Sequence, residues 1–231
     1  MILDIHRFSD RGRTKLDWLE SQHSFSFGDY YNPKQMNFGK LLVLNDDLIQ
    51  PGRGFGMHPH DNMEIITVML EGTLEHKDSM GNIGIIQVGE VQRMSAGTGI
   101  VHSEFNHSKT EKVHLLQLWI EPKELDIKPS YEQKKFTLQK NKIITLVSGE
   151  RSKNHLYLHQ NAKISRGIFK SKEKIDYQPL KSNGTYIFMI RGKIKINNEL
   201  LQAGDAIALT GNMEIITIEP VDILILDVPV H

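Results

Sequence analysis

Short apolar runs separated by turn residues dominate the chain. Most of them are rich in Ile, Val and Leu and are bounded by Gly, Asn, Asp or Pro; examples are KLLVLND, MEIITVML, VHLLQLWI, NKIITLVS and DILILDV. Runs of this length and spacing are typical of antiparallel strands in a sandwich or barrel. The pattern therefore predicts an all-β protein.

Helical periodicity is rare in the same sequence. It predicts one short helix over residues 14–22 (TKLDWLESQ) and a single helical turn over residues 122–125 (PKEL). The expected fold class is all-β with few short helices.

A polar stretch between residues 123 and 142 interrupts the apolar runs and divides the chain. We therefore predict two β modules, one over residues 1–130 and one over residues 131–231. The first carries all the candidate metal ligands described below. The second has no histidine between His159 and His231, so we expect it to lack metal ligands.

The two halves resemble each other at low similarity. Residues 70–91 and 190–207 both read as strand, Gly turn, strand, polar hairpin and a Gly followed by an acidic residue. This alignment pairs Gly72 with Gly192 and Gly89 with Gly204. MEIITV at 63 and MEIITI at 213 look more alike, but they fall out of register with it, so we interpret them as shared strand composition.

Charge and composition exclude several classes of function. The chain has 28 Lys and Arg against 28 Asp and Glu, so no net field attracts nucleic acid or anionic lipid, and neither is an expected partner. The N-terminus lacks an apolar segment of signal-peptide length, and no later run approaches the roughly 20 residues of a membrane span. These features predict a cytoplasmic protein.

The absence of cysteine leaves histidine, carboxylate and hydroxyl groups for chemistry. A strand within residues 57–69 would place His58, His60 and Glu64 on one face because side chains alternate with a period of two. His102 and Glu104 have the same spacing further along. An isolated His-x-His usually lies in a turn or a solvated strand, but the second pair favours a metal site of mixed nitrogen and oxygen ligands, with room for water or substrate.

At these motifs the sequence resembles the cupins. The first cupin motif is matched by Gly52, His58, His60, Glu64 and, one residue late, Gly72. The second is matched by Gly89, Gly99, His102 and Asn106, with Gly97 where many cupins have proline.

Four further stretches resemble the pirin-like bicupins: HSFSFGDYYNP, GFGMHPHDNMEI, LEGTLEHKDSMGN and MSAGTGIVHSEFN. This resemblance implies two tandem cupin jelly-roll β-barrels. It also implies one divalent transition metal held by His58, His60, His102 and Glu104, with Fe(II) expected first and Ni, Mn, Co, Cu or Zn as alternatives.

The general cupin pattern would instead nominate Glu64 as the fourth ligand. We prefer Glu104, because the pirin-specific HSEFN is intact and a ligand two residues from His102 requires no strand distortion. Glu64 is then expected to orient an imidazole, or to be solvated or structural. His76, His107 and His114 match no ligand position, and we expect them on the surface or on edge strands. His23 and the aromatic residues Phe25, Phe27, Tyr30 and Tyr31 could line a wall of the site, but we expect them to pack the N-terminal arm.

The resemblance further implies the activity of bacterial quercetin 2,3-dioxygenases, which cleave the central ring of a flavonol with O2 and release carbon monoxide. Glu104 or Glu64 would accept the proton of the substrate's 3-hydroxyl group. Two alternatives remain open from the sequence. One is a metal- or redox-dependent co-regulator that binds a protein partner, and the other is a cupin oxygenase with another physiological substrate.

Overall fold

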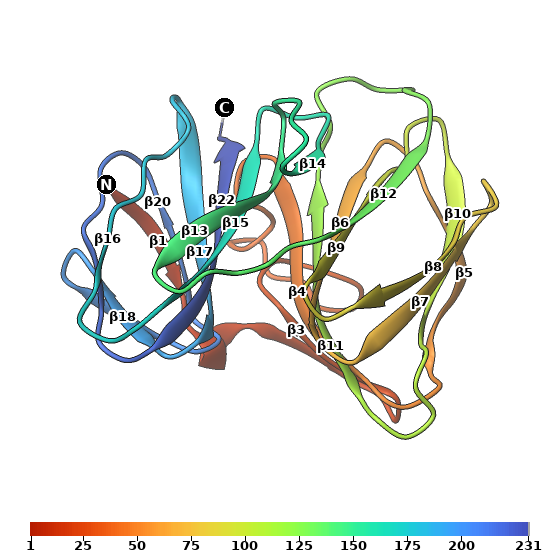
Figure 1. The fold of residues 1–231 in the computed structure, drawn as a ribbon, viewed down its shortest axis with the longest axis horizontal. Coiled ribbons are helices and arrows are strands. Elements are labelled where there is room, and N and C mark those ends of the chain that lie inside the picture. Colours follow the sequence, from red (N-terminus) through yellow and green to blue (C-terminus); the bar gives the residue numbers. More distant parts are fainter. Residues whose placement is uncertain (231) are drawn as a thin grey trace.

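The computed structural model describes residues 1–230, except for the side chains at positions 2 and 3, and it confirms the predicted all-β class. Two modules lie side by side, and each is built from one seven-stranded and one four-stranded sheet (Figure 1). The single helical element among the described residues is the 3-10 helix η1 (Phe8–Asp10). None of the described helices has the length and apolarity needed to cross a membrane.

The first module contains the strands expected from the N-terminal half. Its seven-stranded sheet has the order β12 (Ser130–Lys135), β9 (Glu90–Ser95), β6 (Glu64–Glu71), β11 (Val113–Ile120), β4 (Leu41–Ile49), β3 (Leu19–His23) and β2 (Gly12–Lys15). Its four-stranded sheet has the order β5 (Gly54–His60), β10 (Ile100–Asn106), β7 (Thr73–Asp78) and β8 (Ile83–Gln87).

The second module repeats this plan. Its seven-stranded sheet has the order β1 (Ile2–His6), β20 (Ala206–Leu209), β17 (Asn183–Arg191), β22 (Val221–Pro229), β15 (Lys163–Phe169), β13 (Lys142–Ser148) and β14 (Leu156–Tyr157). Its four-stranded sheet has the order β16 (Lys174–Ile175), β21 (Ile215–Thr217), β18 (Lys193–Ile196) and β19 (Glu199–Gln202). This shared order confirms the two tandem jelly-roll barrels.

The two modules exchange edge strands. The N-terminal strand β1 pairs with β20 of the second module, whereas β12, which follows the first module in the sequence, pairs with β9 of the first. Each of these strands covers a sheet edge that would otherwise expose backbone donors and acceptors. The boundary between residues 130 and 131 stays a prediction, and strand pairing assigns residues 2–6 to the second module's sheet.

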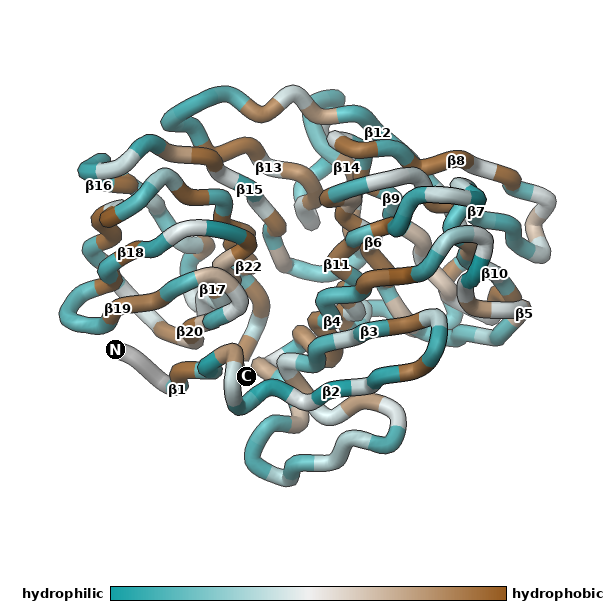
Figure 2. Tube along the Cα trace, turned by 90° about the horizontal axis from the view of Figure 1, so that it is seen from below, coloured by the Kyte–Doolittle hydropathy of each residue, from teal (hydrophilic) through white to brown (hydrophobic). Residues whose placement is uncertain are grey.

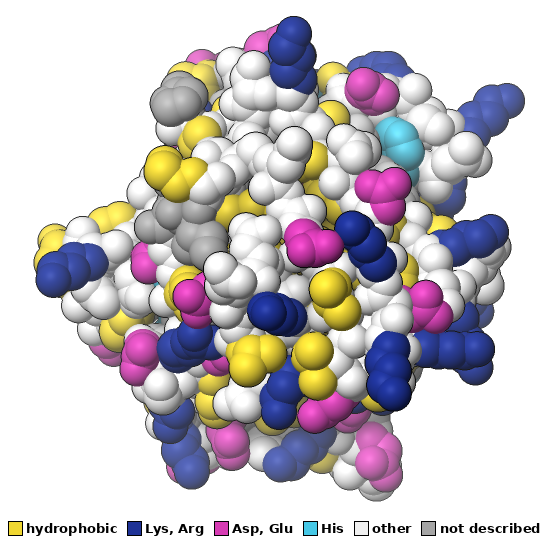
Figure 3. Space-filling model, turned by 90° about the vertical axis from the view of Figure 1, so that its left-hand side faces the viewer, with side chains coloured by type: hydrophobic (Ala, Val, Ile, Leu, Met, Phe, Trp, Pro, Cys, Tyr) yellow, Lys and Arg dark blue, Asp and Glu magenta, His cyan; other side chains and the backbone are white. Residues whose placement is uncertain are grey.

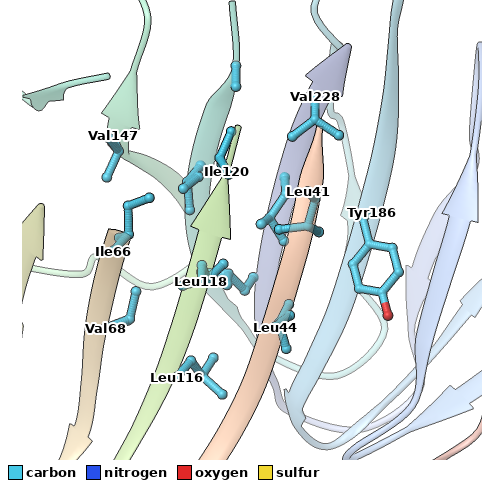
Figure 4. Close-up of a cluster of buried hydrophobic side chains, with 14 of the residues drawn as sticks. Leu41, Leu44, Ile66, Val68, Leu116, Leu118, Ile120, Val147, Tyr186 and Val228 are labelled. Atoms are coloured by element: carbon cyan, nitrogen blue, oxygen red, sulfur yellow. The ribbon is translucent and has the colours of Figure 1, made fainter. Parts of the chain in front are cut away.

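The two seven-stranded sheets pack against each other and form the largest core. Figure 4 shows Ile66, Leu118 and Leu41 of the first module near Val147 and Val228 of the second. Both faces of these sheets are therefore buried, one in its own barrel and one at the interface. This double burial explains why the strands read as continuous apolar runs. In Figure 2 hydrophilic colours prevail in the connecting loops.

The helix predicted over residues 14–22 is wrong. The segment forms the ends of β2 and β3, which pair with each other, and β3 also pairs with β4. In β3, Leu19, Ser21 and His23 are buried, so the true period is two. The helical turn predicted at residues 122–125 is also wrong, because this segment is a non-helical bend.

The predicted repeat is supported by backbone conformation. Gly72 and Gly192 have φ angles of 76° and 84°, and Gly89 and Gly204 both have 83°. Gly72 links β6 to β7, and Gly192 links β17 to β18, so the pairing of glycines matches the pairing of strands. The segment MEIITI lies at β21, which corresponds to β10 and not to β6, so this similarity is one of composition.

Acidic and basic side chains are interspersed on the face of the second module shown in Figure 3. This mixture agrees with the equal numbers of acidic and basic residues in the chain. On this face, no broad region of one sign is available to steer a charged macromolecule.

We predict that Gly192→Ala destabilises the protein by at least about 2 kcal/mol, because an L-residue is strained at positive φ. A Cβ atom there would also lie 2.1 Å from the carbonyl oxygen of Pro220. Gly211→Ala is the matched control, since its φ is 76° but a Cβ atom would meet nothing within 4 Å. Gly211→Ala should lower the free energy of unfolding, measured by urea denaturation, by about 1 kcal/mol. Equal losses of stability in the two variants would contradict a clash with the carbonyl oxygen of Pro220.

Candidate metal centre and adjoining pocket

Two neighbouring strands of the four-stranded sheet bring the predicted histidines together. β5 and β10 are antiparallel, with His58 opposite His102 and His60 opposite Ile100. The ring centroids of His58 and His102 lie 4.4 Å apart, those of His58 and His60 4.9 Å, and those of His60 and His102 5.0 Å. One ring nitrogen of each histidine lies within 4.8 Å of the others.

Glu104 joins this group through His102. One ligand atom each of His76, His102 and Glu104 lies within 4.8 Å of the others, so two potential triads share His102. The Glu104 carboxylate accepts a hydrogen bond of 2.8 Å from Gln117 Nε2 and one of 3.3 Å from Thr67 Oγ1. These two donors fix its orientation.

His76 was expected on the surface or on an edge strand, and that expectation is wrong. It is fully buried, with Nδ1 3.5 Å from Nδ1 of His102 and Nε2 3.1 Å from Oδ2 of Asp78. Leu74, His76 and Asp78 share one face of β7 by the period of two, which is the signal that could have found it. His107 is exposed, as expected. His114 is half-buried beside Asp46 and belongs to β11, which lies between β6 and β4, so the expectation of a surface or edge-strand position does not hold for it.

Asp78 fixes the orientation of the His76 imidazole, which in turn contacts the His102 imidazole. Its carboxylate accepts hydrogen bonds from the backbone N–H groups of Met80 and Asn82 and from the side chain of Asn82. His76 can therefore donate from Nε2 to Asp78 and accept at Nδ1 from His102. This tautomer leaves Nε2 of His102 as a lone-pair donor for a metal.

The donor set fits a divalent transition metal. Nε2 of His102 is buried without a hydrogen-bond partner among the described residues, which is costly unless a ligand occupies the space beside it. Burial and the neighbouring His58 lower the pKa of His102 to about 2 and that of His60 to about 4. Both imidazoles are therefore neutral at physiological pH, the form that binds metals.

Glu64 lies apart from this centre. A turn at Asn62, whose φ is 45°, separates β5 from β6 and resets the alternation of side chains. Glu64 consequently shares a face with Ile66 and Val68, toward the interface between the modules. Its Oε1 is 3.4 Å from Nδ1 of His159, and burial raises its pKa to about 7. The expectation that Glu64 lies on one face with His58 and His60 is wrong.

A cavity of about 470 Å³ adjoins the candidate metal centre. His58 and Glu104 reach it from the metal side. Two aromatic pairs also line it, Trp18 with Phe55 at 5.1 Å and Phe27 with Trp119 at 5.4 Å between ring centroids. His23 lines it as well, so His23 and Phe27 form a wall of this cavity, contrary to the expectation that they pack the N-terminal arm. The strands β3 and β4 contribute further polar side chains.

Comparison with known proteins identifies the family. The Pirin family profile matches residues 6–120, and the profile of the quercetinase C-terminal cupin domain matches residues 145–228. A protein named quercetin 2,3-dioxygenase from Escherichia coli (strain K12) is 42% identical over 205 residues, covering 89% of this chain and 88% of that protein. The chain belongs to the pirin family.

Solved structures of pirins agree with this assignment. The bacterial pirin YhhW from Escherichia coli, in complex with nickel(II), superposes with a TM-score of 0.94 at 39% identity and covers 99% of both chains. A quercetin 2,3-dioxygenase from Acinetobacter baumannii has a TM-score of 0.81 at 19% identity, covering 99% of this chain and 86% of that one. The second likeness shows the shared fold alone.

We predict that His76→Leu lowers metal affinity about 10- to 100-fold, because the N–H of His102 loses its acceptor. His76→Gln keeps an acceptor oxygen and should recover part of this loss. His107→Gln is the control, because His107 is exposed and lies just after β10, and this variant should bind the metal as tightly as the wild type does. Competition with a chromophoric chelator measures the affinities, and equal affinity of the folded His76→Leu protein would contradict the role of His76.

Proposed function

We propose that the protein is a metal-dependent dioxygenase of the quercetin 2,3-dioxygenase type, which cleaves the central ring of a flavonol with O2 and releases carbon monoxide. The observation that carries this proposal is the cluster of three imidazoles beside an aromatic-lined cavity. The activity named for the Escherichia coli relative supports it. The residues that would hold the metal are His58, His60, His102 and Glu104.

We propose Fe(II) as the native metal, with Ni, Mn, Co, Cu and Zn as alternatives that the same ligands accept. Affinity rises toward copper along the divalent series for almost any such ligand set, so the ligands alone do not select the ion. The structure of the Escherichia coli pirin contains nickel(II), which supports the view that this fold also accepts a metal other than iron. When bound, the ion would supply Lewis acidity and coordination positions for a substrate oxygen and for dioxygen.

Glu104 is the proposed proton acceptor for the 3-hydroxyl group of the substrate. Its side chain borders the cavity, and burial raises its pKa to about 7. A carboxyl group with this pKa can take and release a proton near neutral pH, whereas a bound dication would lower the pKa, so Glu104 would act as the base only when it is detached from the ion or weakly bound to it. Hydrogen bonds from Thr67 and Gln117 would fix the orientation of the Glu104 carboxylate during the proton transfer.

The aromatic pairs supply the surface for a flat ligand. Trp18, Phe55, Phe27 and Trp119 present apolar ring faces and edges to the cavity, which favours an aromatic ligand over a sugar or a small acid. A bound flavonol would displace water from these walls. Water exclusion strengthens the electrostatic interactions between the ligand, Glu104 and the imidazoles.

Flavonol turnover is the direct test. The protein is stripped of metal and reloaded with each of the six candidate ions in turn. We expect at least one form to bleach the flavonol absorbance of quercetin under air and to release one carbon monoxide per flavonol consumed. If no loaded form changes the absorbance or produces carbon monoxide, the protein is not a quercetinase.

A matched pair of carboxylates tests the assignment of the base. Glu104→Gln should lower kcat by about 100-fold or more, because the amide cannot accept the proton. Glu64→Gln should leave metal content and kcat within about twofold of the wild type, since Glu64 lies on the interface side of β6. Metal content and steady-state kinetics are measured together. The reverse order of effects would assign the role to Glu64 instead.

A further inference from the structure

A row of polar side chains crosses the inner face of the first module's large sheet. Thr67 on β6 stands opposite Gln117 on β11, which stands opposite Asn45 on β4, which stands opposite His23 on β3. All four are buried or nearly so. Four adjacent strands therefore place polar groups in one line beneath the cavity, where a barrel would ordinarily bury apolar side chains.

The second module shows what this face looks like without a ligand pocket. In the row of its inner face that corresponds to the polar row, Ile187 on β17 and Ile225 on β22 stand where the first module has Thr67 and Gln117, and Ser165 on β15 stands where it has Asn45. The two barrels share their strand order, so the difference lies in side chains and not in backbone. The polar row of the first barrel is thus not a requirement of the fold.

Hydrogen bonds divide the polar residues into two groups. Thr67 and Gln117 serve Glu104 at the metal side. On the other side, Nδ1 of His23 lies 2.8 Å from Oδ1 of Asn45, and Nε2 of His23 lies 2.8 Å from Oγ1 of Thr14. The second group lies on β3 and β4, whereas Thr67 and Gln117 lie on β6 and β11.

Asp47 belongs to this second group and is only half satisfied. It is 3% exposed, lines the cavity and lies opposite Ser21, whose hydroxyl donates to Oδ1. Oδ2 has no hydrogen-bond partner among the residues that the structure describes. An oxygen of a cavity-lining carboxyl group that makes no such bond can hydrogen bond to a ligand in the cavity.

A buried carboxylate with a purely structural role looks different. Asp227 in the second module accepts from Thr185 at Oδ1 and from Tyr177 and the backbone N–H of Leu180 at Oδ2. Both of its oxygens are used to fix a loop. The free oxygen of Asp47 instead faces a cavity between aromatic walls.

We propose that Asp47, held by Ser21, is a second anchoring point of the pocket and hydrogen bonds to a hydroxyl group on an outer aromatic ring of the ligand. The ligand class is thus a planar aromatic with hydroxyl groups at a distance from the metal-binding oxygen. This assignment of Asp47 as a specificity residue rests on the proposed flavonol activity for its choice of ligand. Burial raises the pKa of Asp47 to about 7, and a carboxyl group in either protonation state can bond to a hydroxyl.

Two flavonols that differ in their outer hydroxyl groups test the proposal. Quercetin has hydroxyl groups on both outer rings, whereas 3-hydroxyflavone keeps only the group next to the carbonyl. Binding is measured without oxygen on the metal-loaded protein, so that no turnover occurs. We expect the wild type to bind quercetin about tenfold or more tightly than 3-hydroxyflavone, since the latter leaves Asp47 without a partner.

Substitutions assign this preference to Asp47. Asp47→Ala should weaken quercetin binding about tenfold and leave 3-hydroxyflavone binding within about twofold. Asp47→Asn keeps the shape and a hydrogen-bonding group, so it guards against misfolding and should retain most of the preference. Asp46→Asn is the matched control, because Asp46 is the next residue on β4 and its carboxylate pairs with His114 on the other face. It should leave both affinities unchanged.

The outcomes separate this proposal from the proposed activity. Equal weakening of both flavonols by Asp47→Ala, or no weakening of either, would overturn the role of Asp47 even if quercetin is turned over. A preference for quercetin that depends on Asp47, without any carbon monoxide under air, would sustain the anchoring role and remove the dioxygenase activity. Wild-type protein that binds neither flavonol would overturn both.

Discussion

The packing of the two seven-stranded sheets against each other is the constraint on which the rest of the structure depends. Residues such as Ile66, Leu118 and Val228 bury the outer faces of both sheets in one shared core. Because this core stabilises the sheets from outside, the inside of the first barrel does not have to be apolar. Its inner face can therefore carry Thr67, Gln117 and Asn45 beneath a cavity, while the second barrel is filled.

Burial also gives the candidate metal centre its chemistry. Desolvation keeps His60 and His102 neutral, and the chain from His102 through His76 to Asp78 sets which nitrogen carries the proton. The same desolvation raises the pKa of Glu104 toward neutrality. The proposed metal binding and proton transfer would thus both depend on one property, the exclusion of water by the surrounding strands.

Much of this arrangement could be predicted from the sequence, because it depends on short-range patterns. Apolar runs predicted the strands, and the glycines at 72 and 192 marked the repeat. The spacing of two placed His58 with His60 and His102 with Glu104, and pairing of β5 with β10 then brought the two pairs together. Their roles as ligands remain proposals that metal binding will test.

Other features were decided only by the tertiary structure. The period of two assigns residues to alternate faces, but it does not say which face lies inside the barrel or where a turn resets the count. The turn at Asn62 moved Glu64 to the interface between the modules, and the pairing of β7 with β10 moved His76 beside His102. Residues 14–22 form strands because β3 pairs with β4, and such long-range pairing overrides the local helical preference.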